Sequence, residues 1–112
     1  MANTYKNSIS TITATGSDEA IYTCPSDATA IINTVFVYNG TGGTADYTLT
    51  VADTSAGSSA KIYFKSALAA AATDTVLGSG NVVVLEDSDI LRINTTVQPI
   101  DVTVSVLQIT RA

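Results

Sequence analysis

The chain repeats short runs in which β-branched residues occupy every second position. Threonine, valine and isoleucine make up 39 of the 112 residues, and such side chains suit the pleated surface of a strand. The clearest run, IDVTVSVLQI from Ile100 to Ile109, places Val102, Val104 and Val106 on one face, because successive side chains of a strand point to opposite sides. The pattern predicts an all-β chain of half-buried strands.

Turn residues cut the chain into short segments, which predicts its architecture. Glycine, proline and small polar residues recur about every ten residues, and no amphipathic helix separates the strands. We therefore expect about seven or eight short antiparallel strands in a single β-sandwich, with the jelly roll as one form it could take. The main expected strands are EAIYTC, AIINTVFVYN, ADYTLTVADT, AKIYFKSA, NVVVLEDSDILRINTT, which spans two strands around a turn, and the closing run to Ile109.

The first 17 residues precede the first clear strand and are mostly polar. Ile9 and Ile12 stand among serine and threonine, a pattern that favours an extended segment. This segment could pair within the domain or reach across to a neighbouring subunit. We therefore divide the chain into an extended N-terminal arm, residues 1–17, and a β-sandwich domain, residues 18–112.

The sequence GTGG, residues 40–43, predicts a hairpin between the strands at 30–39 and 45–54. Its glycines tolerate the positive φ angles of tight turns, and the second strand separates Tyr47, Leu49 and Val51 from its threonines. In such a hairpin Tyr38 and Tyr47 could form a cross-strand aromatic pair.

Two further segments leave local questions open. In AKIYFKSA the alternation places Ile62 and Phe64 on one face of the strand and Tyr63 with the two lysines on the other. We expect the lysines to face solvent. The following ALAAAAT, residues 67–73, is too short for a stable isolated helix and could be one helical turn or a connecting loop.

Composition and charge narrow the classes of function. The chain has a net charge of −5, and hydrophobic residues make up 46% and charged residues 13%. A surface rich in neutral side chains suits a subunit covered by its own copies or by a larger assembly, and also a soluble monomer. The basic residues are spread thinly along the chain, so we expect no nucleic-acid partner. They are Lys6, Lys61, Lys65, Arg92 and Arg111.

The hydropathy pattern bears on location. No apolar run approaches the roughly 20 residues of a membrane span, and the start, MANTYKNSIS, lacks an apolar signal segment. We expect no membrane partner and synthesis in the cytoplasm without export by the general secretory route.

The residues Glu86, Asp87 and Asp89 are the candidate metal ligands. Loop carboxylates can chelate calcium, but calcium needs six to eight oxygens in a defined arrangement, and the spaced carboxylates and glycine of a calcium-loop motif are missing here. A solvated turn is the favoured interpretation, with Asp89 capping the turn. The chain has no histidine, and we assign no catalytic, cofactor-binding or metal-binding residue and expect no cofactor.

Other residues have both a functional and a structural interpretation. Cys24 lies before a proline and is expected to be a small buried side chain. The asparagines of NGT and NTT, Asn39 and Asn94, would be glycosylated only in a secreted eukaryotic protein. Sugar binding is the functional alternative for the tyrosines, since aromatic faces stack on carbohydrate, but packing within the sheets is favoured. These are Tyr5, Tyr22, Tyr38, Tyr47 and Tyr63.

Beyond single residues, the order of motifs from Tyr22 to Thr110 resembles the small β-sandwich structural proteins of tailed bacteriophages. These have an opening of the form Y-T-x-P followed by A-x-I-x-x-x-x-V-x-N, then L-x-x-x-D-x-L/I, and a last strand ending in I-T. The chain has YTCP, AIINTVFVYN, LEDSDIL and IT in the same order. Where the group often has glycine before the late aspartate, this chain has Ser88, so its turn geometry is an open question.

The resemblance implies a non-enzymatic virion structural protein, foremost a capsid decoration or cement protein. Its partners would be the major capsid protein or other virion proteins, its localisation the virion, and its state a homo-oligomer in which the arm contributes contacts. The alternatives are a neck, tail or fibre component, or a β-sandwich module that binds carbohydrate or a host surface.

Overall fold

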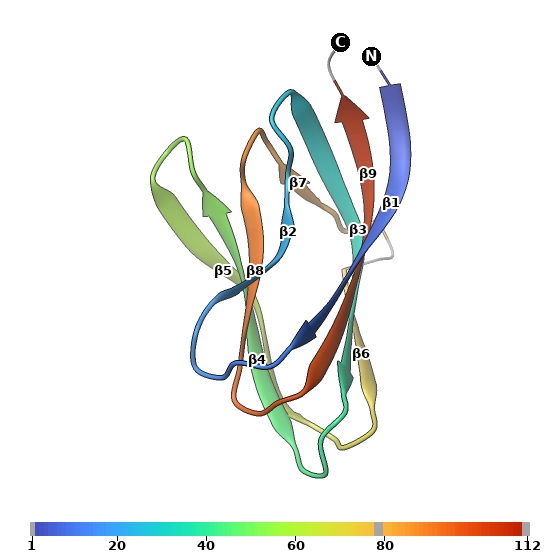
Figure 1. Ribbon diagram of the computed structural model, residues 1–112, viewed down its shortest axis with the longest axis vertical. Helices are drawn as coiled ribbons and strands as arrows, with labels where there is room; N and C mark the ends of the chain where they lie inside the picture. The colour runs from blue at the N-terminus through green and yellow to red at the C-terminus, as the bar shows by residue number, and fades with distance from the viewer. Residues whose placement is uncertain (1, 78–79, 111–112) are drawn as a thin grey trace.

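The computed structural model describes residues 2–77 and 80–110, which form two antiparallel sheets packed face to face (Figure 1). The first sheet has the order β1-β9-β3-β6, with β7 also paired to β3, and the second has the order β2-β8-β4-β5. In this described part every regular element is a strand, so the prediction of an all-β sandwich is confirmed. The strands are β1 (Ala2–Ile12), β2 (Glu19–Thr23), β3 (Ala28–Asn39), β4 (Ala45–Asp53), β5 (Ser58–Leu68), β6 (Thr73–Val76), β7 (Val83–Leu85), β8 (Ile90–Thr95) and β9 (Ile100–Thr110).

The core lies between the sheets and is built by the alternation that the sequence shows. Val102, Val104 and Val106 of β9 are each 0% exposed, as predicted. On the neighbouring strand β3, a bulge between Ile32 and Thr34 shifts the register by one residue. The bulge lets both Ile32 and Val35 face the core, where each is 0% exposed, because the extra residue resets the alternation.

The N-terminal segment is an edge strand of the sandwich. β1 pairs antiparallel with β9 over its whole length, from Ala2 opposite Thr110 to Ile12 opposite Ile100. The segment is extended, as expected, and it pairs within the domain, which decides between the two arrangements left open by the sequence. Residues 2–12 are therefore part of the first sheet, and the separate arm expected for residues 1–17 is not confirmed.

The predicted hairpin around residues 40–43 is wrong. β3 belongs to the first sheet and β4 to the second, so the glycine-rich segment is an arch that crosses from one sheet to the other. Asn39, at 0% exposure, organises the arch: its Nδ2 donates to the carbonyls of Gly43 at 2.7 Å and Leu68 at 2.9 Å. Its Oδ1 accepts from the backbone N of Thr41 at 3.0 Å.

The edge strand β5 departs from simple alternation. Its pairing with β4 is interrupted by two register shifts, and Ile62 and Phe64 are 38% and 61% exposed, while Tyr63 packs against the core. Ile62 and Phe64, which the sequence pattern places on the face opposite the lysines, are therefore exposed and lie outside the core. After β5, residues 69–72 form a turn without a helix, the second of the two alternatives for the alanine-rich segment.

Candidate functional site

The acidic loop between β7 and β8 gathers a different set of carboxylates from the predicted one. Ligand oxygens of Asp53, Glu86 and Asp89 lie within 4.8 Å of one another, whereas Asp87 is outside this group. Sequence reasoning missed Asp53 because it ends β4, far away in the chain, and only the pairing of β4 with β8 brings it to the loop.

Carboxylate oxygens of Asp89 and Asp53 already accept hydrogen bonds that stabilise turns. Asp89 is 4% exposed; its Oδ2 accepts from the backbone N of Glu86 at 3.0 Å and its Oδ1 from the backbone N of Thr54 at 3.3 Å. The predicted capping role of Asp89 is confirmed. Asp53 accepts from the Ser55 hydroxyl at 2.9 Å and the backbone N of Ala56 at 3.1 Å, and these bonds lower the pKa of its carboxyl.

Ser88 answers the question left by the missing glycine. Its φ is +68°, in the left-handed region that glycine adopts most easily. The turn keeps this shape because the Ser88 backbone N donates to the Cys24 carbonyl at 3.1 Å and the Cys24 N donates to the Asp89 carbonyl at 2.9 Å. The loop is thereby tied to the end of β2.

The five tyrosines do not form one binding platform. Tyr5 and Tyr38 are 80% and 38% exposed, while Tyr22 and Tyr47 are buried. The expected Tyr38–Tyr47 pair is replaced by Tyr47 and Tyr63, whose ring centroids lie 5.9 Å apart at an interplanar angle of 39°.

A hydrogen-bond network joins the two sheets at the edge formed by β5 and β6. The hydroxyls of Tyr47 and Tyr63 both donate to Oδ2 of Asp74, at 2.6 and 3.1 Å. Burial, with the Asp74 carboxylate as acceptor and neighbour, raises the pKa of both tyrosines above the usual value. Sequence reasoning missed Asp74, because TDTV is an ordinary strand sequence and its partners come from other strands.

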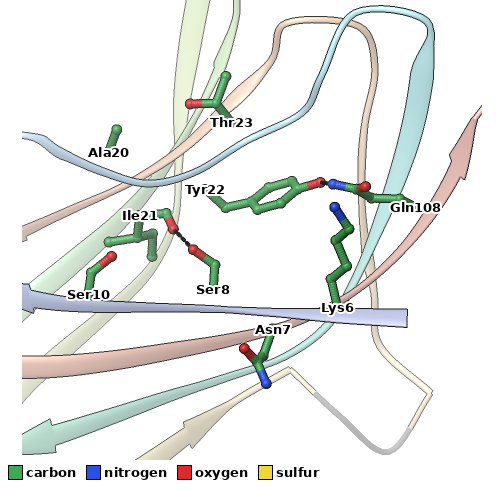
Figure 2. Close-up of a pocket in the computed structure, with 9 residues that line it drawn as sticks. All are labelled: Lys6, Asn7, Ser8, Ser10, Ala20, Ile21, Tyr22, Thr23 and Gln108. Atoms are coloured by element: carbon green, nitrogen blue, oxygen red, sulfur yellow. Dashed lines mark hydrogen bonds between the residues drawn. The ribbon is translucent and has the colours of Figure 1, made fainter. Parts of the chain in front are cut away.

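At the opposite edge, β1 and β2 face each other across an open groove of about 430 Å³ (Figure 2). The side chains of Tyr22 and Gln108 meet at its inner end, where Gln108 Nε2 donates to the Tyr22 hydroxyl at 2.5 Å, and Figure 2 shows Lys6 pointing toward this pair. The Ser8 hydroxyl donates to the Ile21 carbonyl at 2.9 Å. The lining offers hydrogen-bond donors and acceptors and one ammonium group, a set suited to binding polar groups.

The outer face of the first sheet carries an apolar row across four strands, which we call the outer row. The register aligns Tyr5 with Leu107, Leu107 with Ile31, and Ile31 with Val84. Tyr5 and Val84, the ends of the row, are 80% and 54% exposed. Beyond a polar cross-strand row of Asn7, Ser105 and Thr34, Ile9 and Phe36 lie on either side of Thr103 and are 71% and 42% exposed.

Cys24, Asn39 and Asn94, the other residues considered from the sequence, have structural roles. Cys24 is 1% exposed and its Sγ lies 3.4 Å from the Ala28 carbonyl, which confirms the expected burial. Asn39 is buried in the arch, and Asn94 donates to Asp18 Oδ1 at 3.0 Å.

The basic residues within the described ranges lie on three strands. Lys6 is on β1, Lys61 and Lys65 are on β5, and Arg92 is on β8, while Arg111 lies outside the described residues. In these same ranges, no helix has the length and apolar character to cross a membrane.

No protein-family model matches the chain, and no curated protein matches its sequence.

Proposed function

We propose that the sandwich is a jelly roll. The strand pairs β1–β9, β2–β8, β3–β6/β7 and β4–β5 are nested, as in one long hairpin whose two arms are rolled into two sheets. Additional pairing of β9 with β3 and of β8 with β4 joins these pairs into the two sheets. A jelly roll consists of eight strands in two Greek keys. The chain has eight strands if β6 and β7 are counted as one interrupted strand, so the arrangement supports the jelly-roll assignment.

We propose that the protein is a non-enzymatic structural subunit of a bacteriophage virion, foremost a capsid decoration or cement protein. The observation that carries this proposal is the exposed apolar surface of the first sheet, the outer row with Ile9 and Phe36. Exposed apolar side chains gathered on one face in this way are typical of a surface that another protein covers. Jelly rolls are also a recurrent architecture of viral capsid proteins.

The motif residues behind the phage resemblance support the fold part of the proposal. Asn39 organises the arch between the sheets, Asp89 caps the β7–β8 turn, and Ile32 and Val37 are 0% exposed. Such residues would be shared by proteins with this scaffold, whereas the contacts to a partner would lie on the surface, where the sequence has less constraint.

In this proposal the partners are the major capsid protein or other virion proteins, and the subunit acts as a homo-oligomer located on the virion. The subunit would act through the surface it buries against its partners. Specific interfaces bury about 1,200–2,000 Å², and the outer row provides an apolar centre for one. A neck, tail or fibre position would use the same surface.

The test is binding of the purified chain to particles that lack it. We expect saturable binding to particles, and immunogold labelling then separates capsid from neck, tail and fibre. A Tyr5→Ser/Val84→Ser variant, altered at the two exposed ends of the outer row, should bind more weakly, while Phe64→Ser on the second sheet serves as the matched control. Absence of particle binding by the folded wild-type chain, together with a positive glycan array, would replace the proposal with the carbohydrate-binding module.

A further inference from the structure

The outer edge of β1 is a long, regular strand edge without a partner strand. β1 pairs with β9 over 11 residues without a register shift, and it contains no proline. Among the described residues, the only hydrogen bond from β1 to β2 is that of the Ser8 hydroxyl to the Ile21 carbonyl. An exposed row of backbone donors and acceptors is a template on which another strand can pair.

The side chains of β1 make this edge suited to a second copy of itself. Tyr5 and Ile9 stand on the outer face, at 80% and 71% exposure, and they lie symmetrically on either side of Asn7. In an antiparallel pair centred on Asn7, Tyr5 of one copy would stand opposite Ile9 of the other, twice. Aromatic and β-branched residues are favourable cross-strand partners.

Other centres of the same pairing are less favourable. A centre on Lys6 would place the two ammonium groups directly opposite each other, which is destabilising. A centre on Ser8 would place Tyr5 opposite Thr11 and Ile9 opposite Asn7. Only the centre on Asn7, among these three, matches both apolar residues and sets Lys6 opposite a serine.

We propose that two copies of this chain pair through β1, antiparallel about a twofold axis at Asn7, so that their first sheets join into one continuous sheet. An interface of this kind is isologous, with the same surface used by both copies. The outer rows of the two copies then lie on the same face of the joined sheet and extend the apolar surface. The inference rests on the homo-oligomeric part of the proposed function and not on the virion location.

A pair of cysteine variants tests the register. Asn3 and Asn7 are both exposed and lie on the same face of β1. The Asn7→Cys variant should form a disulfide-linked dimer under mild oxidation, because the two introduced thiols face each other at the twofold axis. The Asn3→Cys control should stay unlinked, since its counterpart in the second copy stands opposite Thr11. The wild-type chain, with Cys24 at 1% exposure, gives the background.

A charge exchange tests the opposition of Tyr5 and Ile9. The variant Ile9→Lys should weaken dimerisation at least tenfold by analytical ultracentrifugation. Adding Tyr5→Glu to it should restore most of the loss at low salt, because each introduced carboxylate then faces the ammonium of the other copy. The two positions are four residues apart along one strand, so a restored dimer cannot come from a contact within a chain.

The outcomes separate this inference from the proposed function. Rapid linking of Asn7→Cys alone, with rescue by the double variant, supports the β1 pairing. A monomeric wild-type chain, or equal linking of Asn3→Cys and Asn7→Cys, overturns it. A chain that pairs through β1 but ignores particles would remove the virion proposal instead, and a chain that binds particles without pairing through β1 would remove only this inference.

Discussion

The two open edges of the sandwich are built in opposite ways. The β5–β6 edge is closed by the Tyr47–Asp74–Tyr63 network, and β5 carries two register shifts and two lysines. The β1–β2 edge is joined by the Ser8–Ile21 and Gln108–Tyr22 hydrogen bonds, contains the groove, and presents a regular strand. Bulges and lysines are devices that keep strand edges from pairing, so the contrast indicates that pairing is blocked at one edge and left available at the other.

Removing the acceptor at the closed edge should have the largest effect. We expect Asp74→Ala to lower the free energy of unfolding by about 3 kcal/mol, because it removes two hydrogen bonds to a carboxylate and leaves the buried Tyr47 hydroxyl without its acceptor. Urea denaturation measures the change. The control Tyr63→Phe removes only the longer bond and should cost less than about 1 kcal/mol; equal losses in both variants would show that the Tyr47–Asp74 bond contributes little.

The hydrogen bond at the β1–β2 edge should contribute less. We expect Tyr22→Phe to cost about 1–2 kcal/mol, because Gln108 Nε2 then lacks its acceptor in a site where Gln108 is 7% exposed. In the double variant Tyr22→Phe/Gln108→Met, both polar partners are gone, so the free energy of unfolding should recover much of what Tyr22→Phe alone loses. A double-mutant cycle in urea measures the coupling, and purely additive losses would show that the bond contributes little.

The dependence of stability on alkaline pH should differ between variants at the two edges. The pKa of Tyr47 is raised in the folded chain above the ordinary 10.0, so its contribution to stability is complete below about pH 10 and declines as pH rises beyond that. One such tyrosine lowers the free energy of unfolding by about 1.4 kcal/mol per pH unit. Tyr47→Phe should flatten this decline more than Tyr22→Phe does, as followed by urea midpoints between pH 9 and about 11; equal flattening would argue against the contrast.

The smallest effect on folding is expected at the β1 edge strand itself. Ile9→Thr changes a side chain that is 71% exposed, so the free energy of unfolding of the monomer should change by less than about 0.5 kcal/mol. Measurements at low protein concentration isolate this quantity from association. A loss above about 1 kcal/mol would mean that Ile9 stabilises the subunit's own packing rather than a contact between subunits.

The features of the fold that could be predicted from the sequence depend on local patterns. The core face of β9 follows from period-two alternation alone, and the capping role of Asp89 follows from local turn chemistry. Both depend on residues close in the chain. The strand content and the sandwich were therefore predictable.

The predictions that were wrong or incomplete concern features that depend on pairing between strands far apart in the chain. A glycine-rich turn between two alternating strands predicts a hairpin locally, but β3 pairs with β9 along its length, and that pairing leaves β4 to the other sheet. Phe64 stands opposite Thr48 of β4, a pairing that only the folded sheet sets, and Asp74 meets its two tyrosines only after the sheets have packed. Neither signal is present in the residues themselves.

The pairing of the first strand with the last has a consequence for synthesis. Ala2 stands opposite Thr110, so the start of β1 and the end of β9 lie at the same pole of the molecule (Figure 1). At about 5–20 residues per second, a ribosome needs roughly 5–20 seconds to make the strand that β1 awaits. During that interval Tyr5 and Ile9 belong to a segment whose partner strand has not yet been made.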